Sequence, residues 1–440
     1  MYCAYITTLK SVRKHTNADR LQVATVFGND VIVDLSYQPG QRVIYFPTDG
    51  QLSEEFANDN NLVRKKDENG NNIGGYLDPD KRNITALKLR GEKSDGLILP
   101  IEVLSKYTDI STLKDGDQIT ILNGHEICKK YIPRRQYRQG GGGQGNRTRK
   151  HKEPIAPLFA EHADTEQLAY NLSAFKQGDH IEITLKMHGT SQRTGYLPVF
   201  QGYKRTWIDK LLRRKGAPIY DWGYISGTRR VVLDDFEGGF YGSNHFREQH
   251  SKFFEGKLQK GETVYYEVVG FTDSGAPIMG SVPNKRTGDK EFVRQYGETT
   301  TFSYGCSPDG KELPQSMLYV YRMTMTNEDG YVVEYTPDFM RYRCEQMGCN
   351  CVPEFWRGYL TDDIEDVGAF VTQVAELFYD GPDPVGKSHV REGIVVRIVN
   401  RPKFTAYKHK NFSFKCLEGI AKADAEAPDM EEAQEETVNE

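Results

Sequence analysis

The chain has 440 residues, of which 38% are hydrophobic and 27% are charged, and its formal net charge is −5. This length predicts two or three domains. There is no run of about 18 apolar residues and no long apolar signal-peptide core, so we expect a cytoplasmic protein without a membrane span. The seven cysteines are an odd number spread over a long chain, which argues against a disulfide framework.

Residues 1–128 consist of short β-branched and aromatic segments separated by turns. Three such segments are 21–27, 31–35 and 42–46. Glycines and prolines punctuate them, for example at Gly28 and at Pro39-Gly40. This spacing predicts a small all-β domain, either a barrel or a sandwich.

Residues 129–153 differ sharply in composition. They contain Gly140 to Gly143, many lysines and arginines, and the tyrosines Tyr131 and Tyr137. Such a segment cannot bury a core, which predicts a flexible linker. Its charge could neutralise nucleic-acid phosphates while its tyrosines stack on bases, or it could be a solvated hinge.

Residues 154–419 mix strand and helix patterns, which predicts an α+β domain of antiparallel sheets with helices. The expected strands include 263–269, 318–323 and 393–399, and residues 363–379 have helical spacing. The tail, 420–440, is acidic and poor in hydrophobic residues, so we expect it to be disordered.

One lysine stands at the end of a predicted strand. Ile181, Ile183 and Leu185 alternate with polar residues, and the pattern ends at Lys186. Gly189 follows closely, and a glycine lets a phosphate or another backbone segment approach. Downstream come Glu267 within an apolar run, Glu392-Gly393 before a valine-rich run, and Lys408-His409-Lys410.

This ordered set resembles the motifs of covalent nucleotidyltransferases, the superfamily of ATP-dependent DNA and RNA ligases and GTP-dependent capping enzymes. Lys186-Met-His-Gly-Thr190 is most similar to RNA ligases of the T4 RNA ligase 2 type. Segments 18–21, 40–49 and 89–97 resemble a subgroup with an N-terminal OB-like domain. The resemblance implies an ATP-grasp-like nucleotidyltransferase domain preceded by a small OB-like barrel.

The resemblance also implies a role for each motif residue. Lys186 would be the nucleophile, and Lys408 and Lys410 would contact the α-phosphate. By the same resemblance, Glu392 would bind the metal and Glu267 the ribose, while Val395 and Tyr321 (or Tyr319) would pack on the two faces of the purine. Arg229 (or Arg230) would contact the ribose or the 5′-phosphate, and His188 and Gly189 would contact the nucleotide. A free lysine is only about 0.04% neutral at pH 7, so nearby cations would have to activate Lys186.

Two positions depart from related patterns. His188 stands where DNA ligases, and often the barrel-containing subgroup, have Asp, so it could orient the lysine or a metal-bound water instead. Ser191 stands where DNA ligases commonly have Arg. The sequence therefore predicts a monomeric ATP-dependent RNA ligase that uses Mg²⁺ or Mn²⁺ and acts on nicked duplexes or broken ends. The alternatives are a DNA ligase, a capping enzyme and a non-catalytic RNA-binding protein that retains a nucleotide pocket.

Overall fold

The computed structural model describes residues 2–66, 72–131, 155–163, 165–212, 214–233, 236, 245–287 and 289–423. The chain divides into two compact units. Unit 1 comprises residues 1–136, 283–299 and 412–428, and unit 2 comprises 137–282, 300–411 and 429–440. The predicted domains were continuous ranges, whereas two segments from the second half of the chain group with the N-terminal residues.

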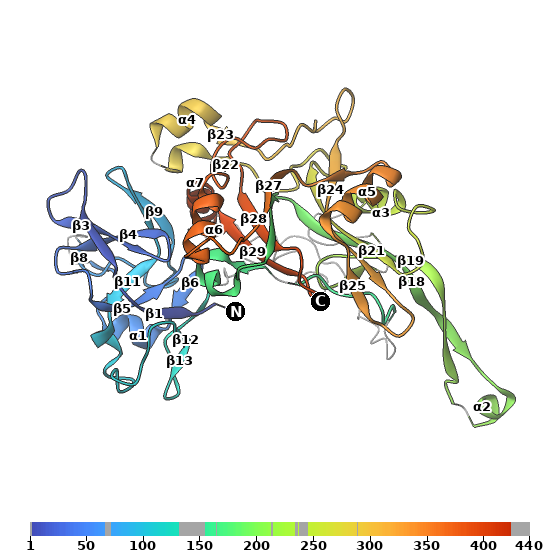
Figure 1. The fold of residues 1–440 in the computed structure, drawn as a ribbon, viewed down its shortest axis with the longest axis horizontal. Coiled ribbons are helices and arrows are strands. Elements are labelled where there is room, and N and C mark those ends of the chain that lie inside the picture. Colours follow the sequence, from blue (N-terminus) through green and yellow to red (C-terminus); the bar gives the residue numbers. More distant parts are fainter. Residues whose placement is uncertain are drawn as a thin grey trace. The chain divides into compact units, whose positions relative to one another are not determined.

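Unit 1 is built mainly from small sheets (Figure 1). A four-stranded sheet contains, in spatial order, β11 (Leu97–Pro100), β5 (Arg42–Phe46), β1 (Ala4–Thr8) and β12 (Gln118–Ile119). A three-stranded sheet contains β2 (Ser11–Lys14), β3 (Leu21–Val26) and β4 (Asn29–Asp34). The paired strands are β6 (Gly50–Leu52) with β15 (Cys128–Lys130), β7 (Lys65–Lys66) with β8 (Asn72–Gly74), β9 (Ala86–Leu89) with β10 (Glu92–Asp95), and β13 (Ile121–Leu122) with β14 (His125–Glu126).

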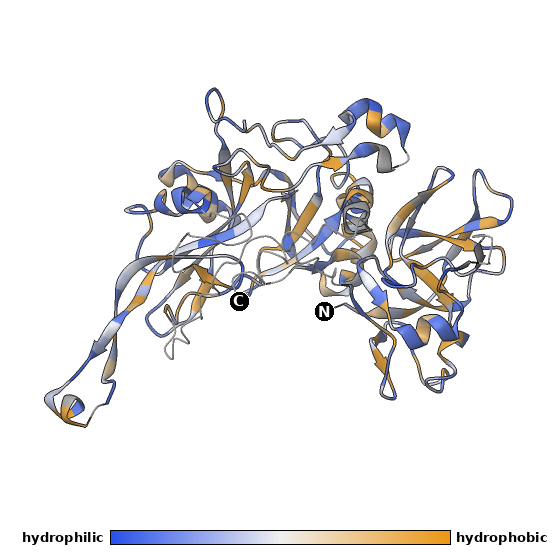
Figure 2. Ribbon diagram, turned by 180° about the vertical axis from the view of Figure 1, so that it is seen from behind, coloured by the Kyte–Doolittle hydropathy of each residue, from blue (hydrophilic) through white to orange (hydrophobic). Residues whose placement is uncertain are grey.

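Apolar residues alternate with polar ones along the strands of unit 1, and its helices and loops contribute further apolar residues (Figure 2). Its core includes Ile6, Ile44 and Phe46 from the strands and Phe56 from α1 (Glu54–Asp59). The other helical elements of this unit are η1 (Ile101–Leu104), η4 (Asn284–Thr287), α4 (Lys290–Tyr296) and α7 (Phe412–Ala423). The all-β character expected for residues 1–128 is largely present, and the OB-like barrel stays a prediction.

Helix α7 belongs to unit 1 through both apolar and charged contacts. Phe412 and Cys416 pack with Ala86 of β9. The Lys415 ammonium forms an ion pair with Asp95 of β10 at 2.5 Å, and both side chains are mostly buried. These contacts pack α7 against β9 and β10 within unit 1.

Unit 2 contains two larger sheets (Figure 1). The five-stranded sheet contains, in spatial order, β16 (Glu166–Gln167), β29 (Thr405–Lys410), β28 (Gly393–Ile398), β17 (His180–Lys186) and β27 (Glu354–Tyr359). The seven-stranded sheet contains β20 (Val232–Leu233), β19 (Ala217–Gly227), β18 (Thr190–Lys204), β21 (Glu262–Gly270), β24 (Ser316–Thr326) and β25 (Val332–Glu334), with β26 (Asn350–Cys351) pairing with β24. The short ladder of β22 (Val282–Pro283) and β23 (Thr299–Thr300) flanks residues 284–298.

The helical elements of unit 2 are η2 (Leu168–Tyr170), η3 (Leu172–Ala174), α2 (Trp207–Leu211), α3 (His245–Lys252), α5 (Pro337–Met347) and α6 (Val367–Glu376). Helix α6 is shorter than the predicted 363–379. It starts at Val367 because Asp366 is its N-cap, with the carboxylate accepting a hydrogen bond from the Ala369 N–H. The predicted α+β class with antiparallel sheets is confirmed.

The five-stranded sheet has one apolar and one polar face at β17. Ile181 and Ile183 pack with Ile394, Val396 and the buried residues of α6. Because side chains alternate along a strand, the neighbouring residues of β17 point to the opposite face. That polar face forms part of the candidate site.

The predicted linker and the predicted acidic tail lie mostly outside the described residues. The linker was predicted from Lys129, but Lys129 and Lys130 lie in β15 and Tyr131 is buried, so Tyr131 is not available to stack on bases. The rest of the predicted linker and most of the acidic tail lie outside the described residues. Within the described ranges, no helix has the length and apolar character needed to cross a bilayer.

Candidate active site

Lys186 is the last residue of β17, where it pairs with Gly393 of β28. The next turn contains Gly189, which packs tightly on β21. A Cβ atom at this position would lie 2.5 Å from the Val268 carbonyl oxygen, closer than side-chain atoms are found. Gly189 therefore allows the chain to leave Lys186 and enter β18 directly against β21.

The turn is also held by Tyr304. Its hydroxyl oxygen accepts a 2.7 Å hydrogen bond from the His188 backbone N–H. The His188 ring packs edge-on against Phe302, with the ring centroids 4.6 Å apart. These contacts fix the backbone that follows the lysine.

A buried carboxylate lies between two lysines. The Glu392 Oε1 atom is 2.7 Å from the Lys186 Nζ and 3.3 Å from the Lys410 Nζ. Glu392 is 1% exposed, while the lysine side chains are 14% and 13% exposed. Its second oxygen, Oε2, lies 3.8 Å from the His188 Nδ1 and accepts no hydrogen bond from the described residues.

Gly393 makes this placement possible. Its φ of +149° lies in the region that favours glycine, and a Cβ there would be 2.1 Å from the His409 carbonyl oxygen. Gly393 pairs with Lys186 on one side and Lys410 on the other. One glycine thus brings β17, β28 and β29 together beside Glu392.

Lys408 lies two residues before Lys410 on β29, so both side chains point to the same face. Lys408 pairs with Val395 of β28, and Val395 lines the adjacent pocket. The strand register therefore places Lys408 one step further along the same sheet face than Lys410.

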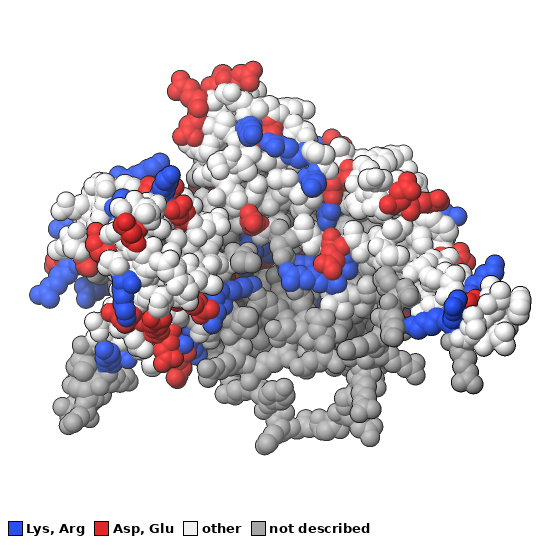
Figure 3. All heavy atoms as spheres, turned by 90° about the horizontal axis from the view of Figure 1, so that it is seen from below, with Lys and Arg blue, Asp and Glu red and all other residues white. Residues whose placement is uncertain are grey.

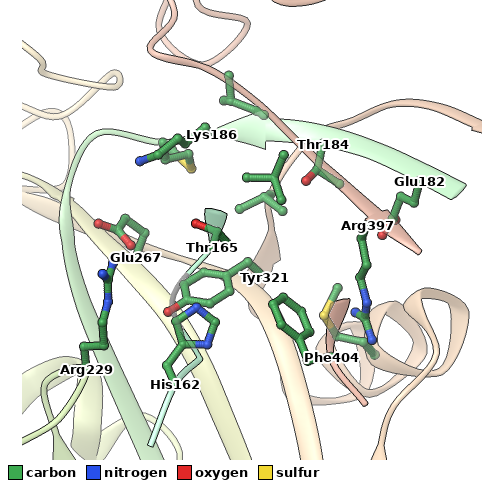
Figure 4. A pocket seen from close by; sticks show the side chains of 15 residues that line it. His162, Thr165, Glu182, Thr184, Lys186, Arg229, Glu267, Tyr321, Arg397 and Phe404 are labelled. Atoms are coloured by element: carbon green, nitrogen blue, oxygen red, sulfur yellow. The ribbon is translucent and has the colours of Figure 1, made fainter. Parts of the chain in front are cut away.

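A pocket opens between the two sheets of unit 2 (Figure 4). Five predicted site residues line it: Lys186, Arg229, Glu267, Tyr321 and Val395. Figure 4 shows the Glu267 carboxylate between the Lys186 amine and the Arg229 guanidinium. The structure thus brings together predicted site residues that are far apart in the chain, such as Lys186 and Val395, which are 209 positions apart.

One member of each pair of alternatives, Tyr321 or Tyr319 and Arg229 or Arg230, lines the pocket. Tyr321 lines the pocket, and its hydroxyl is 2.8 Å from the Ser191 Oγ. Burial, and next the charge of Glu267, raises the pKa of Tyr321, so its phenol stays protonated. Tyr319 and Arg230 are not among the lining residues, whereas Tyr321 and Arg229 are.

Tyr321 also occupies an irregular point in the sheet. The register between β21 and β24 shifts at Tyr265/Tyr266, so that Tyr265 pairs with Arg322 and Tyr266 with Val320. The extra residue between these pairs is Tyr321. A bulge of this kind re-aims a side chain, which here points into the pocket.

His162 is a pocket residue that the sequence analysis did not identify. Its ring centroid lies 5.1 Å from that of Tyr321 and 5.5 Å from that of Phe404. Burial, and next the charge of Arg322, lowers the pKa of His162 well below its ordinary value, so the ring is neutral. His162 comes from a loop without strand or helix periodicity, and no local pattern marks it.

Other missed lining residues did carry a signal. Glu182 and Thr184 share the face of β17 on which Lys186 lies, because the three are two residues apart. The polar positions of this alternating strand therefore line the pocket. Arg397 continues this surface on β28, where it pairs with Glu182.

Comparison with known proteins rests on structure alone, since no family model and no curated protein matches the chain. The Naegleria gruberi RNA ligase with pyrophosphate superposes with a TM-score of 0.56 at 16% identity, covering 94% of this chain and 98% of that one. A mutant of that ligase with ATP and Mn gives 0.54 at 15% identity over the same shares. A further mutant with AMP and Mn gives 0.54 at 15%.

The chain has the RNA ligase fold. The match extends over nearly the full length of both proteins, so it includes both units. At this level of identity the similarity establishes the fold. The side chains of the pocket decide which chemistry this fold can perform here.

Proposed function

We propose that this protein is an ATP-dependent RNA ligase that joins 3′-hydroxyl and 5′-phosphate ends. The observation that carries the proposal is Lys186 at the mouth of the pocket, paired with Glu392 and close to Lys410. A lysine nucleophile, a carboxylate and a second cation beside a pocket with aromatic and apolar walls match the needs of nucleotidyl transfer.

The lining residues suit a nucleotide in the following orientation. The purine would lie between Tyr321 and Val395, one from each sheet, and the Glu267 carboxylate would accept hydrogen bonds from the ribose hydroxyls. Arg229 would contact the ribose or the 5′-phosphate of the nick. The α-phosphate would then lie at Lys186, with Lys408 and Lys410 stabilising its charge and Gly189 allowing close approach.

The reaction would take three steps. The neutral Lys186 amine attacks the α-phosphorus of ATP, which forms a lysyl-AMP phosphoramide and releases pyrophosphate. The 5′-phosphate of the RNA then attacks the same phosphorus, which restores the lysine and gives an RNA-adenylate. Finally the 3′-hydroxyl attacks the activated 5′-phosphate, forms the phosphodiester and releases AMP.

In the proposed reaction, Glu392 would influence the protonation of Lys186 through their ion pair. With the carboxylate 2.7 Å away, the ammonium form is favoured, and an ammonium cannot attack phosphorus. With Glu392 binding a divalent ion instead, the ion and Lys410 would both present positive charge to Lys186. The lysine can then lose its proton more easily.

A divalent ion fits this site through Glu392. The buried Oε2 atom of Glu392 accepts no hydrogen bond from the described residues, so it is available as a ligand. Within the same residues no group of three or more His, Cys, Asp or Glu side chains could hold a metal. The ion would thus be held by Glu392 together with nucleotide phosphates and water, as is usual for Mg²⁺. His188 would orient one of the metal-bound waters. Bound there, Mg²⁺ or Mn²⁺ would neutralise charge on the phosphates.

The choice of ATP and RNA is supported by the Naegleria gruberi RNA ligase, which has been observed with ATP, AMP and Mn. A DNA ligase and a non-catalytic RNA-binding protein remain the alternatives. The intact set of Lys186, Glu267, Glu392 and Lys410 favours a catalyst over a binding protein. We further propose, as the sequence predicts, that the protein is a cytoplasmic monomer that repairs nicks or breaks in RNA.

The test is covalent labelling. The protein is incubated with α-³²P-labelled ATP or GTP and Mg²⁺ or Mn²⁺, and then separated on a denaturing gel. We expect a label from ATP that requires Lys186, followed by transfer to a nicked RNA duplex. A label from GTP alone would indicate a capping enzyme, and no label from either nucleotide would refute the proposal.

A further inference from the structure

A long hairpin projects from the seven-stranded sheet of unit 2, with α2 at its free end (Figure 1). Strand β18 pairs with β21 only over Thr190–Gly195, and beyond that point it pairs with β19 alone. We call residues 196–224 the arm. The free part of β18 has nine residues, which at about 3.3 Å each corresponds to a length of roughly 30 Å.

The tip of the arm, residues 204–215, is strongly basic. It contains six lysines and arginines and one aspartate, a net charge of +5. Lys204, Arg205, Arg214 and Lys215 are exposed, and basic side chains gather at the end of the arm in Figure 3. The aspartate, Asp209, is engaged locally by the backbone N–H and the hydroxyl of Thr206.

The tip also exposes large apolar side chains. Trp207 is 74% exposed and Leu211 is 73% exposed, and both belong to α2. They lie four residues apart, so they occupy the same side of the helix. A solvent-exposed tryptophan beside several cations is unusual for a surface without a ligand.

An aromatic stripe runs along one face of the arm toward this tip. The stripe consists of Tyr196, Phe200, Tyr220, Trp222 and Tyr224. The strand register pairs Tyr196 with Tyr224 and Phe200 with Tyr220, and residues paired across two strands point to the same face. The stacked rings of Tyr196 and Tyr224 have centroids 4.6 Å apart, and the Lys260 ammonium lies 5.2 Å from the Trp222 ring.

We infer that the arm binds the RNA duplex beside the end to be joined. The charge of the tip complements a polyanion, and aromatic faces interleaved with cations are the surface that nucleic acids recognise. The arm is continuous with β18, which starts four residues after Lys186. A duplex held at the tip would therefore be kept at a fixed distance from the nucleophile. This inference rests on the proposed function.

Two double substitutions test the basic and the apolar side chains of the tip separately. Removing Arg214 and Lys215 (both to Ala) should lower the slope of log affinity against log salt by roughly 1.5, because each phosphate contact adds roughly 0.7–0.9. If the variant and wild type bind RNA equally at 1 M salt, the variant should therefore bind roughly thirtyfold more weakly than wild type at 0.1 M salt. Trp207→Ala with Leu211→Ala should weaken binding with an unchanged slope. The control, Arg294→Ala with Lys311→Ala, removes the same charge from exposed positions elsewhere.

The reach of the arm gives a second readout. The full-length protein and its variants are assayed on pre-adenylylated nicked RNA with flanks of about 20 or about 6 base pairs on each side. About 30 Å spans roughly nine phosphates of one strand at 3.4 Å each. We expect the arm variants to lose affinity and sealing on the long flanks, to match wild type on the short flanks, and to form lysyl-AMP normally.

The outcomes separate the two proposals. A wild-type protein that neither labels with ATP nor seals RNA would refute the proposed function and this inference with it. If wild type seals RNA and the arm variants match it in affinity, salt slope and sealing on long flanks, the inference alone is wrong. Phosphatidylserine vesicles are tested in parallel by sedimentation. Tip-dependent vesicle binding without tip-dependent RNA binding would also overturn it.

Discussion

Replacing Glu392 by Gln isolates the charge at the centre of the candidate site. Glutamine keeps nearly the same shape but removes the negative charge that faces Lys186 and Lys410. At an effective dielectric constant of about 20, a charge pair at 2.7 Å is worth about 6 kcal/mol and one at 3.3 Å about 5 kcal/mol. The cost of burying the carboxylate offsets much of this. Removing one partner of a buried pair typically costs about 3–5 kcal/mol.

We therefore expect Glu392→Gln to lower the free energy of unfolding of unit 2 by about 3 kcal/mol at pH 7. The loss of the metal contact should reduce lysyl-AMP formation at least tenfold, which is about 1.4 kcal/mol of transition-state stabilisation. All three tryptophans, at positions 207, 222 and 356, lie in unit 2. Their fluorescence during urea unfolding reports the stability of that unit, and labelling with α-³²P-ATP reports the first chemical step.

Glu376→Gln is the matched control. Glu376 also pairs with a residue of β29, His409, at 3.1 Å, but its side chain is 43% exposed. An exposed pair contributes about 1 kcal/mol or less, so both stability and labelling should change little. If Glu392→Gln labels within threefold of wild type and unfolds at the same urea concentration, Glu392 neither holds the metal nor organises the two lysines.

Four further predictions follow, three from the site and one from the buried Asp383 of unit 2. Lys186→Ala should abolish covalent labelling with an unchanged fold by circular dichroism, and any remaining label would exclude this lysine as the nucleophile. Lys410→Ala should slow labelling at least tenfold at saturating ATP, and a near-normal rate would show that it does not contact the transferring phosphate. Tyr321→Ala should raise the KM for ATP several-fold more than Tyr319→Ala, because only Tyr321 lines the pocket; equal effects would argue against stacking on Tyr321. Burial raises the pKa of Asp383 to about 7, so the folded state binds its proton more tightly than the unfolded state does, and stability is lost as pH rises from about 4 to about 7. The free energy of unfolding of Asp383→Asn should therefore increase relative to that of wild type as pH rises across this window. A difference between the two proteins that stays constant with pH would refute this prediction.

The sequence by itself determined the local elements that carry the motifs. The alternation of Ile181, Ile183 and Leu185 places Lys186 at a strand end, and β17 runs from His180 to Lys186. The run after Glu392 forms β28, starting at Gly393 as predicted. These predictions succeed because side-chain periodicity and glycine conformation depend only on neighbouring residues.

Only the tertiary structure decided what surrounds that lysine. His162 and Phe404 enter the pocket from irregular segments far apart in the chain, and no local pattern marks either of them. Tyr321 points into the pocket because the sheet register shifts beside it, and a register shift depends on two strands at once. Helix α7 likewise follows the last motif residue directly but groups with unit 1, through contacts with residues more than 300 positions earlier. A sequence pattern reports which residues a strand or helix can present, whereas the partner of each face is fixed by packing between segments that only the folded chain brings together.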